Sequence, residues 1–210
     1  MGLLAGHTTA PTGLVEPPEH PLGAVLDRIV AADIAAMRET AAQLDLPTLG
    51  RAAQTLAGAR RVDICGTGDS ALVGAQLQAC LHGLGVAAWF WQDLHAGLAS
   101  AATLTAEDVA FGVSHSGRCK ETVEILAEAA SRGAWTIALT SSAGSPLAGV
   151  ADLVLVTAVP PPTPQQPAAM LARHPELMVL DLLTIAVAQH IAVAQQVAVA
   201  QHRRGDGDRP

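Results

Sequence analysis

Aromatic and charged residues are scarce in this chain of 210 residues. Tyrosine is absent, aromatic residues make up only 2% of the chain, and Lys120 is the single lysine. Hydrophobic residues still account for 50%, so the core must consist of Ala, Val, Leu and Ile, and it is large enough for one α/β domain of ordinary size. The net charge of −7 disfavours a nucleic-acid-binding module, because such modules carry a basic face.

Paired cysteines and long apolar runs are also missing. The three cysteines, Cys65, Cys80 and Cys119, contain no Cys-x-x-Cys pair, which excludes a disulfide framework and a structural zinc site. We therefore expect no metal site, and a cytoplasmic protein, because free thiols persist in a reducing cytosol. The N-terminus lacks the basic region of a signal peptide. No stretch of about 18 uninterrupted apolar residues marks a membrane span, so we expect no membrane partner.

The chain alternates between short apolar runs and segments with helical periodicity. The runs predict strands at 61–66, 86–91, 108–114, 134–140 and 152–157, with helices at about 22–44, 47–58, 70–83, 93–102, 119–132 and 168–202. Continuous apolar strands separated by helices are typical of a parallel sheet that is covered on both faces. We therefore predict an α/β fold: a five-stranded parallel, doubly wound, flavodoxin-like sheet with flanking helices.

Both ends of the chain depart from this alternation. Residues 1–21 are rich in Gly, Pro and Thr without periodicity, which predicts a disordered tail, and 203–210 is predicted as a second tail. The domain then spans 22–202, with a core at about 45–190 preceded by a helical extension, and a Pro-rich loop covers 159–167. Ala-Val-Ala-Gln occurs three times in the last helix at a period of six, which matches no coiled-coil seam and is interpreted as local sequence expansion.

The segment Gly66-Thr67-Gly68-Asp69-Ser70 follows the first strand and opens a helix. Glycines let a ligand approach the backbone amides, and a helix N-terminus favours phosphate through its N–H groups and partial positive charge. Ser70 adds a hydroxyl donor. A structural turn without a ligand has the same pattern, and Gly-x-Gly also opens dinucleotide-binding folds, in which Asp93 would bind a ribose.

The segment Ser114-His115-Ser116-Gly117-Arg118-Cys119-Lys120 follows the third strand. Two serine hydroxyls, the backbone amides of 117–120 and two nearby cations would suit an anion. The alternative is a helix cap, with Ser116 at the N-cap and Glu121 as its partner. Two such loops at the carboxyl ends of adjacent parallel strands favour a ligand site.

The pair Gly-Thr-Gly-Asp-Ser and Ser-His-Ser-Gly-Arg-x-Lys-Glu-Thr-Val-Glu resembles the sugar isomerase (SIS) domain, a phosphosugar-binding module. Thr140 with 145–148, and the helix from Arg173 to Asp181, extend the resemblance over about 45–190. The sequence is most like the effector domain of RpiR-type transcription regulators. In those proteins a helix-turn-helix domain precedes this segment. The residues before 22 are too few for one, so we expect no direct nucleic-acid binding.

The resemblance implies a set of ligand-binding residues and no cofactor. The residues that it implies for the phosphosugar are Gly66, Gly68, Ser70, Ser114, His115, Ser116, Gly117, Cys119 and Arg173. Cys119 stands where the family usually has Thr or Ser. A thiol is a weaker hydrogen-bond donor than a hydroxyl, and we expect this one to be buried and neutral.

Whether the chain is an enzyme depends on a catalytic base. SIS isomerases move a proton between C1 and C2 of a sugar phosphate, which requires a carboxylate or imidazole. The candidates are His95, His115, Glu121, His174 and Glu176, each with a purely structural alternative such as solvation at a helix start. Phosphohexuloisomerase-like relatives carry a glutamate where this chain has Arg173, and a guanidinium does not serve as a base. We therefore favour a phosphosugar-sensing protein over an aldose–ketose isomerase, with a nicotinamide-dependent enzyme as a weaker alternative.

The first and last helices offer more apolar surface than a five-stranded sheet needs. Such helices usually meet a twofold partner, so we expect a homo-oligomer, either a dimer or a tetramer. His95 or His174 would then reach the site of the partner chain. The alternative is that the two helices pack against each other within one chain.

Overall fold

The computed structural model describes residues 22–159 and 168–206. Its helices are α1 (Gly23–Gln43), α2 (Leu46–Gly58), α3 (Ser70–Gly83), α4 (Leu94–Ala101), α5 (Lys120–Ser131), α6 (Pro146–Gly149) and α7 (Ala168–Asp206). Its strands are β1 (Arg61–Cys65), β2 (Ala88–Trp91), β3 (Asp108–Val113), β4 (Trp135–Thr140) and β5 (Leu153–Val156). The predicted tail at 1–21, the end of the second tail at 207–210 and nearly all of the Pro-rich loop lie outside the described residues.

The five strands form one parallel sheet in the order β2-β1-β3-β4-β5. Ile64 of β1 pairs with Phe90 on one side and Phe111 on the other, and Leu139 of β4 pairs with Leu155 of β5. Every residue of the central strand β3 is buried, as expected for a strand that helices cover on both faces. The predicted five-stranded parallel, doubly wound sheet is confirmed.

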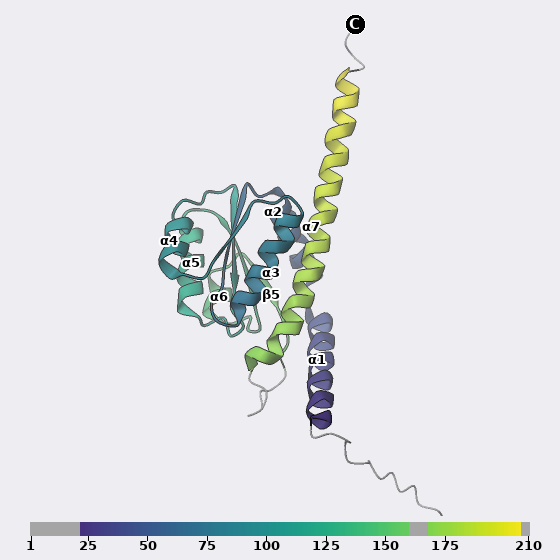
Figure 1. The fold of residues 1–210 in the computed structure, drawn as a ribbon. Coiled ribbons are helices and arrows are strands. Elements are labelled where there is room, and N and C mark those ends of the chain that lie inside the picture. Colours follow the sequence, from purple (N-terminus) through teal and green to yellow (C-terminus); the bar gives the residue numbers. More distant parts are fainter. Residues whose placement is uncertain (1–21, 160–167, 207–210) are drawn as a thin grey trace, which may run out of the picture.

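Two apolar cores, one on each face of the sheet, hold the helices in place (Figure 1). On one face Leu56 of α2, Leu77 of α3 and Leu183 of α7 pack on the strands. On the other face Leu126 of α5 and Leu147 of α6 do the same, together with α4. Because the helices lie in two opposed layers, the loops that follow neighbouring strands can leave the sheet toward opposite faces.

The helices α1 and α7 lie side by side along part of their lengths (Figure 1). Thr40 of α1 is buried, and its Oγ1 accepts a hydrogen bond from the amide of Ala158 at 2.8 Å. Nearer the start of α7, His174 Nδ1 lies 2.9 Å from Asp33 Oδ2. The intramolecular alternative is therefore correct for this part of the two helices, although exposed apolar side chains remain on both.

Two predicted boundaries differ by more than one residue, and one short helix is absent from the prediction. The strand β2 begins at Ala88 instead of 86, because the amide of Val86 still bonds to the carbonyl of Leu81 and closes the end of α3. The prediction lacks α6, a single turn that begins with Ser145 as its N-cap and proline in its first turn. The last helix continues to Asp206, four residues past its predicted end.

The segment of α7 from Ala172 to Ala198 is long and apolar enough to cross a membrane by length and composition. The core helix of a soluble protein passes the same test. Val179, Leu183 and Val187 of this segment are buried against the domain. The observation is therefore weak evidence for a membrane span.

Candidate functional site

Two loops leave the sheet at the boundary between the neighbouring strands β1 and β3. The loop 66–69 leads to α3 on one face of the sheet, and the loop 114–119 leads to α5 on the other. In open parallel sheets, ligands bind at such a switch point, outside the carboxyl ends of the strands. The two loops that the sequence singled out therefore meet at the place where this architecture binds ligands.

Side-chain contacts join the two loops. The amide of His115 donates to Ser70 Oγ at 3.4 Å, and Thr67 Oγ1 lies 3.0 Å from Cys119 Sγ. The Cys119 thiol also donates to Glu121 Oε2 at 3.0 Å. Cys119 is only partly buried, so the expectation of a buried thiol is wrong. Its sulfur instead connects the second loop to the first.

A third loop, which follows β4, fixes the backbone of the second. The carbonyl of His115 accepts hydrogen bonds from the amide and the hydroxyl of Ser141, both at 2.8 Å, and from Thr140 Oγ1 at 3.1 Å. The carbonyl of Gly117 accepts from the amide of Leu147 at 3.0 Å. The second loop is thus held on one side by the β1 loop and on the other by the β4 loop.

The two helices that begin at the switch point lack side-chain caps. In α2, α4 and α6 the N-cap residues Asp45, Asp93 and Ser145 accept hydrogen bonds from first-turn amides. In α3 and α5 the N-cap residues Asp69 and Cys119 make no such bond. First-turn amides that no side chain satisfies are the groups that bind anions at helix N-termini. The arrangement therefore suits a phosphate.

Two alternative interpretations of the loops change here. Ser116 is not the N-cap of α5; its Oγ accepts from the amide of Arg118 at 3.3 Å, inside the loop. The capping hypothesis for Ser116 is therefore wrong. Asp93, which a dinucleotide site would use for a ribose, accepts from the amide of Ala96 at 2.8 Å and caps α4.

The side chain of His115 lies against Glu176 of α7. Its Nδ1 is 3.9 Å from Glu176 Oε1, and both atoms are buried without a hydrogen-bond partner. Glu176 is only 2% exposed, so the alternative that it is solvated is wrong. Burial raises the pKa of Glu176 to about 7, against the opposing effect of Arg173. Burial also lowers the pKa of His115, so burial shifts both groups toward their neutral forms.

Arg173, which precedes Glu176 by three residues on α7, approaches the first loop. Its terminal nitrogen lies 3.9 Å from Asp69 Oδ1, whereas its Nε is buried without a partner. His115, Arg173 and Glu176 therefore each contribute one buried polar atom that lacks a partner. Buried polar groups of native proteins are nearly always satisfied by protein, water or ligand, so these three atoms are available to water or to a polar ligand.

Comparison with known protein families agrees with this geometry. The SIS domain matches residues 55–186, which is more than half of the chain. The chain belongs to the SIS domain family. The resemblance that the two loop motifs indicate is thereby confirmed.

Relatives of this SIS domain include transcription regulators. An uncharacterized HTH-type regulator of Caldanaerobacter subterraneus is 37% identical over 166 residues, which are 79% of this chain and 58% of that protein. The sugar isomerase domain of an RpiR transcription factor from Sphaerobacter thermophilus superposes with a TM-score of 0.70 at 28% identity, over 86% of this chain and 98% of that one. The NanR protein of Vibrio vulnificus, complexed with ManNAc-6P, superposes with a TM-score of 0.74 at 25% identity, over 85% and 70% of the two chains. The chain spans little more than half the length of the curated regulator.

The SIS fold brings the predicted ligand residues to one edge of the sheet. Buried among them are Gly66, Ser114 and Gly117, partly buried are Ser70, His115, Cys119 and Arg173, and exposed are Gly68 and Ser116. Their proximity follows from the strand order and the contacts above. Their contact with a phosphosugar stays a prediction.

The candidate bases separate into two groups. His115 and Glu176 adjoin each other beside the loops. Glu121 is exposed, and the hydrogen bond from Cys119 lowers its pKa. His95 is exposed in the first turn of α4, and the exposed His174 pairs with Asp33 of α1.

Sequence reasoning missed Thr67, Asp69 and Ser141. The first two lie inside the glycine motif but received no role of their own, and they contact Cys119 and Arg173. Ser141 belongs to a Thr-Ser-Ser run that begins with the last residue of β4. The sequence signal for Ser141 was a cluster of hydroxyl residues at the carboxyl end of a buried strand. That this cluster contacts the second loop follows from the strand order, in which β4 lies next to β3.

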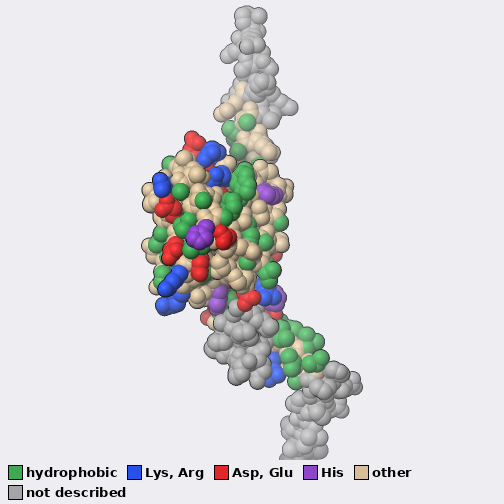
Figure 2. All heavy atoms as spheres, turned by 60° about the vertical axis from the view of Figure 1, so that its left-hand side comes forward, with side chains coloured by type: hydrophobic (Ala, Val, Ile, Leu, Met, Phe, Trp, Pro, Cys, Tyr) green, Lys and Arg blue, Asp and Glu red, His purple; other side chains and the backbone are tan. Residues whose placement is uncertain are grey.

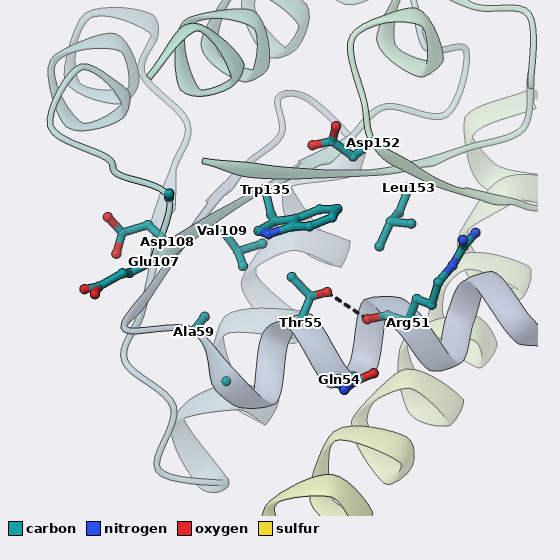
Figure 3. Close-up of a pocket in the computed structure, with 12 residues that line it drawn as sticks. Arg51, Gln54, Thr55, Ala59, Glu107, Asp108, Val109, Trp135, Asp152 and Leu153 are labelled. Atoms are coloured by element: carbon teal, nitrogen blue, oxygen red, sulfur yellow. Dashed lines mark hydrogen bonds between the residues drawn. The ribbon is translucent and has the colours of Figure 1, made fainter. Parts of the chain in front are cut away.

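A further cavity lies at the opposite, amino edge of the sheet. It measures about 620 Å³ between α2 and the starts of β3, β4 and β5. In Figure 3 the ring of Trp135 lies over Thr55 of α2, between Val109 and Leu153. Asp152, which also lines it, already accepts hydrogen bonds from Thr136. Asp108 also lines this cavity, and its Oδ1 is buried without a partner, but its Oδ2 accepts hydrogen bonds from Arg60 and the amide of Thr105. We place the site at the carboxyl edge, where three such atoms, from His115, Arg173 and Glu176, adjoin the two loops.

A smaller hollow adjoins the second loop. It measures about 300 Å³ and is lined by Arg118, Lys120, Val123, Glu124 and Pro146. Two of the few cations of the chain thus stand beside the N-terminus of α5. They add positive potential on this side of the loop.

We predict that Gly117→Ala destabilises the fold more than Gly68→Ala. Both glycines have positive φ, 64° and 57°, so each substitution costs about 1–2 kcal/mol of backbone strain. A Cβ at position 117 would also collide with Ser145, whereas nothing lies within 4 Å of one at 68. The collision adds about 1–3 kcal/mol. Urea unfolding of both variants measures the difference, and equal losses would contradict the close approach of the second loop to Ser145 in the loop after β4.

We predict that the stability gained by Glu176→Gln depends on pH. The pKa of Glu176 rises from 4.5 to about 7 in the folded state, so the folded protein holds a proton that the unfolded chain has lost. The contribution of Glu176 to wild-type stability therefore falls as pH rises from about 4.5 to about 7. Glutamine avoids this loss, which reaches about 3 kcal/mol above that range.

Urea unfolding of both proteins from about pH 4 to about pH 8 tests this expectation. The lowered pKa of His115 makes stability rise with pH in the wild type, and the same histidine is present in the variant. The difference between the two proteins therefore isolates Glu176. A difference that stays constant over the whole range would contradict a buried, uncompensated carboxyl group.

Proposed function

We propose that this SIS domain binds a sugar phosphate at the carboxyl edge of β1 and β3, and that binding serves to sense the sugar phosphate. The observation that carries the proposal is the meeting of two uncapped helix N-termini with the hydroxyls of Ser70, Ser114 and Ser116 at one switch point. Hydroxyls and first-turn amides are the usual phosphate ligands where no metal takes part.

The phosphate end of the ligand is assigned to the two loops. The Ser70 hydroxyl accepts a hydrogen bond from the amide of His115 and thus lies between the two loops. Ser116 is exposed and turned into its own loop by the amide of Arg118. The Cys119 thiol, in contrast, is engaged by Thr67 and Glu121. We therefore propose that the serines and the backbone, more than Cys119, hold the phosphate.

The sugar end of the ligand is assigned to α7. Arg173, Glu176 and His115 each present a buried polar atom without a partner. Sugar hydroxyls both donate and accept hydrogen bonds, so they would satisfy a guanidinium and a carboxyl group together. The complex of NanR with ManNAc-6P, a protein 25% identical to this chain, supports a phosphorylated sugar as the class of ligand.

We further propose a cytoplasmic homo-oligomer that does not itself bind nucleic acid. Among the described residues, Cys65, Cys80 and Cys119 are free thiols, which suits a reducing compartment. On the face shown in Figure 2, positive and negative side chains are interspersed without a continuous basic surface. The curated relatives are named as transcription regulators, which supports a regulatory role for the sensed ligand.

We predict that Ser116→Ala weakens sugar-phosphate binding and that Ser131→Ala does not. The first change removes a hydroxyl from the proposed phosphate site, at a cost of about 1–2 kcal/mol, or roughly tenfold in affinity. Ser131 lies at the other end of α5, where its hydroxyl donates to the carbonyl of Glu128. A thermal-shift panel of pentose and hexose phosphates identifies the ligand, and calorimetry then compares the variants. Failure of every sugar phosphate to bind, or equal affinity of both variants, would overturn the assignment.

An aldose–ketose isomerase is the second candidate, and Glu176 favours it. A buried carboxyl group with a pKa near 7 is the profile of a general base, because it is partly ionised at the operating pH. It would take a proton from the carbon beside the carbonyl and return it to the neighbouring carbon. Arg173 and the regulator relatives argue for binding without this step.

We predict that the wild type incorporates no deuterium into its bound sugar phosphate in deuterated water. Sensing requires no carbon–hydrogen bond to break, whereas isomerisation exchanges the transferred proton with solvent. Mass spectrometry of the recovered sugar phosphate measures the exchange. Deuterium incorporation that disappears in Glu176→Gln, while calorimetric binding persists, would replace the sensor by the isomerase.

A further inference from the structure

The second half of α7 leaves the domain. Figure 1 shows the helix continuing far past the sheet, away from α1. Its last buried residue is Val187, Ile191 still packs partly on the core, and residues 192–198 are all exposed. Only 22% of the most apolar window in the helix is buried. A long apolar helix is thus exposed to solvent, which is costly in a soluble protein unless another surface covers it.

The exposed apolar residues of α7 form a stripe of their own. Leu182, Ile185, Val193 and Val197 are 39–58% exposed, and with Gln189 they follow one another at steps of three or four residues. At 100° per residue these five positions fall within about 120° of the helix circumference. We call them the outer stripe. The residues that pack on the domain, such as Leu183 and Val187, are centred on a different side of the helix.

The outer stripe suits a copy of itself. Between Leu182 and Gln201 the sequence contains no Asp, Glu, Lys or Arg, so two copies meet without repulsion between fixed charges. Gln189 in the stripe carries both a donor and an acceptor, so a glutamine of the partner can satisfy it reciprocally. The many alanines allow close approach of two helices. An isologous interface requires this kind of self-complementarity.

We propose that a second copy of this chain covers the outer stripe, so that two α7 helices pair outside their domains. The stripe is about 20 Å long between Leu182 and Val197, and it continues from the domain into the free part of the helix without interruption. This interface lies apart from the sugar-phosphate site. It would join the chains of the homo-oligomer through their last helices.

A lipid bilayer fits the same surface less well. Gln189, Gln195, Gln196 and Gln201 interrupt the apolar run, and an amide without a partner is expensive in hydrocarbon. Helices that lie on a membrane surface are usually rich in cations along the polar face, and no cation occurs between Arg173 and Gln201. The partner with matching chemistry is therefore another α7.

Light scattering after size exclusion tests the pairing with the full chain. We expect the wild type to have the mass of at least two chains of 21.4 kDa, and Val193→Glu/Val197→Glu to have half the wild-type mass. Burying or opposing the new charges should raise the dissociation constant by more than about a hundredfold. Both positions are exposed, so circular dichroism and the sugar-phosphate thermal shift should stay unchanged.

Two control variants sharpen the result. Gln195→Glu adds one negative charge, against two in Val193→Glu/Val197→Glu, at an exposed position outside the outer stripe and should keep the wild-type mass. Val30→Glu disturbs the exposed apolar residues of α1 instead, and it too should leave the α7 pair intact. A monomeric wild type would overturn the proposal, whether or not it floats with phosphatidylcholine vesicles. An unchanged mass of the Val193/Val197 variant, with loss of mass in Val30→Glu, would place the interface on α1.

Discussion

The burial of a parallel sheet on both faces is the constraint from which the rest of this structure follows. Apolar strands such as β3 have no solvated side, so their connections must divide between two helical layers. The division occurs between β1 and β3, where α3 turns to one layer and α5 to the other. The space between the two diverging loops, at the N-termini of both helices, is a consequence of apolar packing before any ligand is considered.

His115 connects the two loops to the last helix. Its amide bonds to the first loop and its carbonyl to the third, so its backbone is fixed beside α7, where its side chain lies 3.9 Å from Glu176. The resulting pair is buried without full hydrogen bonding, which costs stability. Proteins keep such groups where a ligand or a reaction uses them, and this cost is the physical reason for placing the sugar end of the site on α7.

The helix α7 combines three tasks along its length. Its first turns carry Arg173 and Glu176 at the site, its middle supplies Leu183 and Val187 to the core, and its last turns extend into solvent. Pro175 lies inside the helix, between Arg173 and Glu176, and a proline in a helix interior removes a backbone hydrogen bond and kinks the helix. Glu176 and the projecting end therefore share the part of α7 that follows the proline, whereas Arg173 precedes it.

The sequence alone determined the fold class, nearly every element and the two loops, because apolar periodicity and glycine–serine motifs are local signals. It also identified the SIS resemblance that the family match confirmed. Tertiary structure decided what local signals do not contain: that Cys119 bridges to Thr67, that Ser116 is not a cap, and that Glu176 is buried while His174 pairs with Asp33. These outcomes depend on which strands are neighbours and where α7 crosses them, and residues far apart in the chain carry no sequence signal of their proximity.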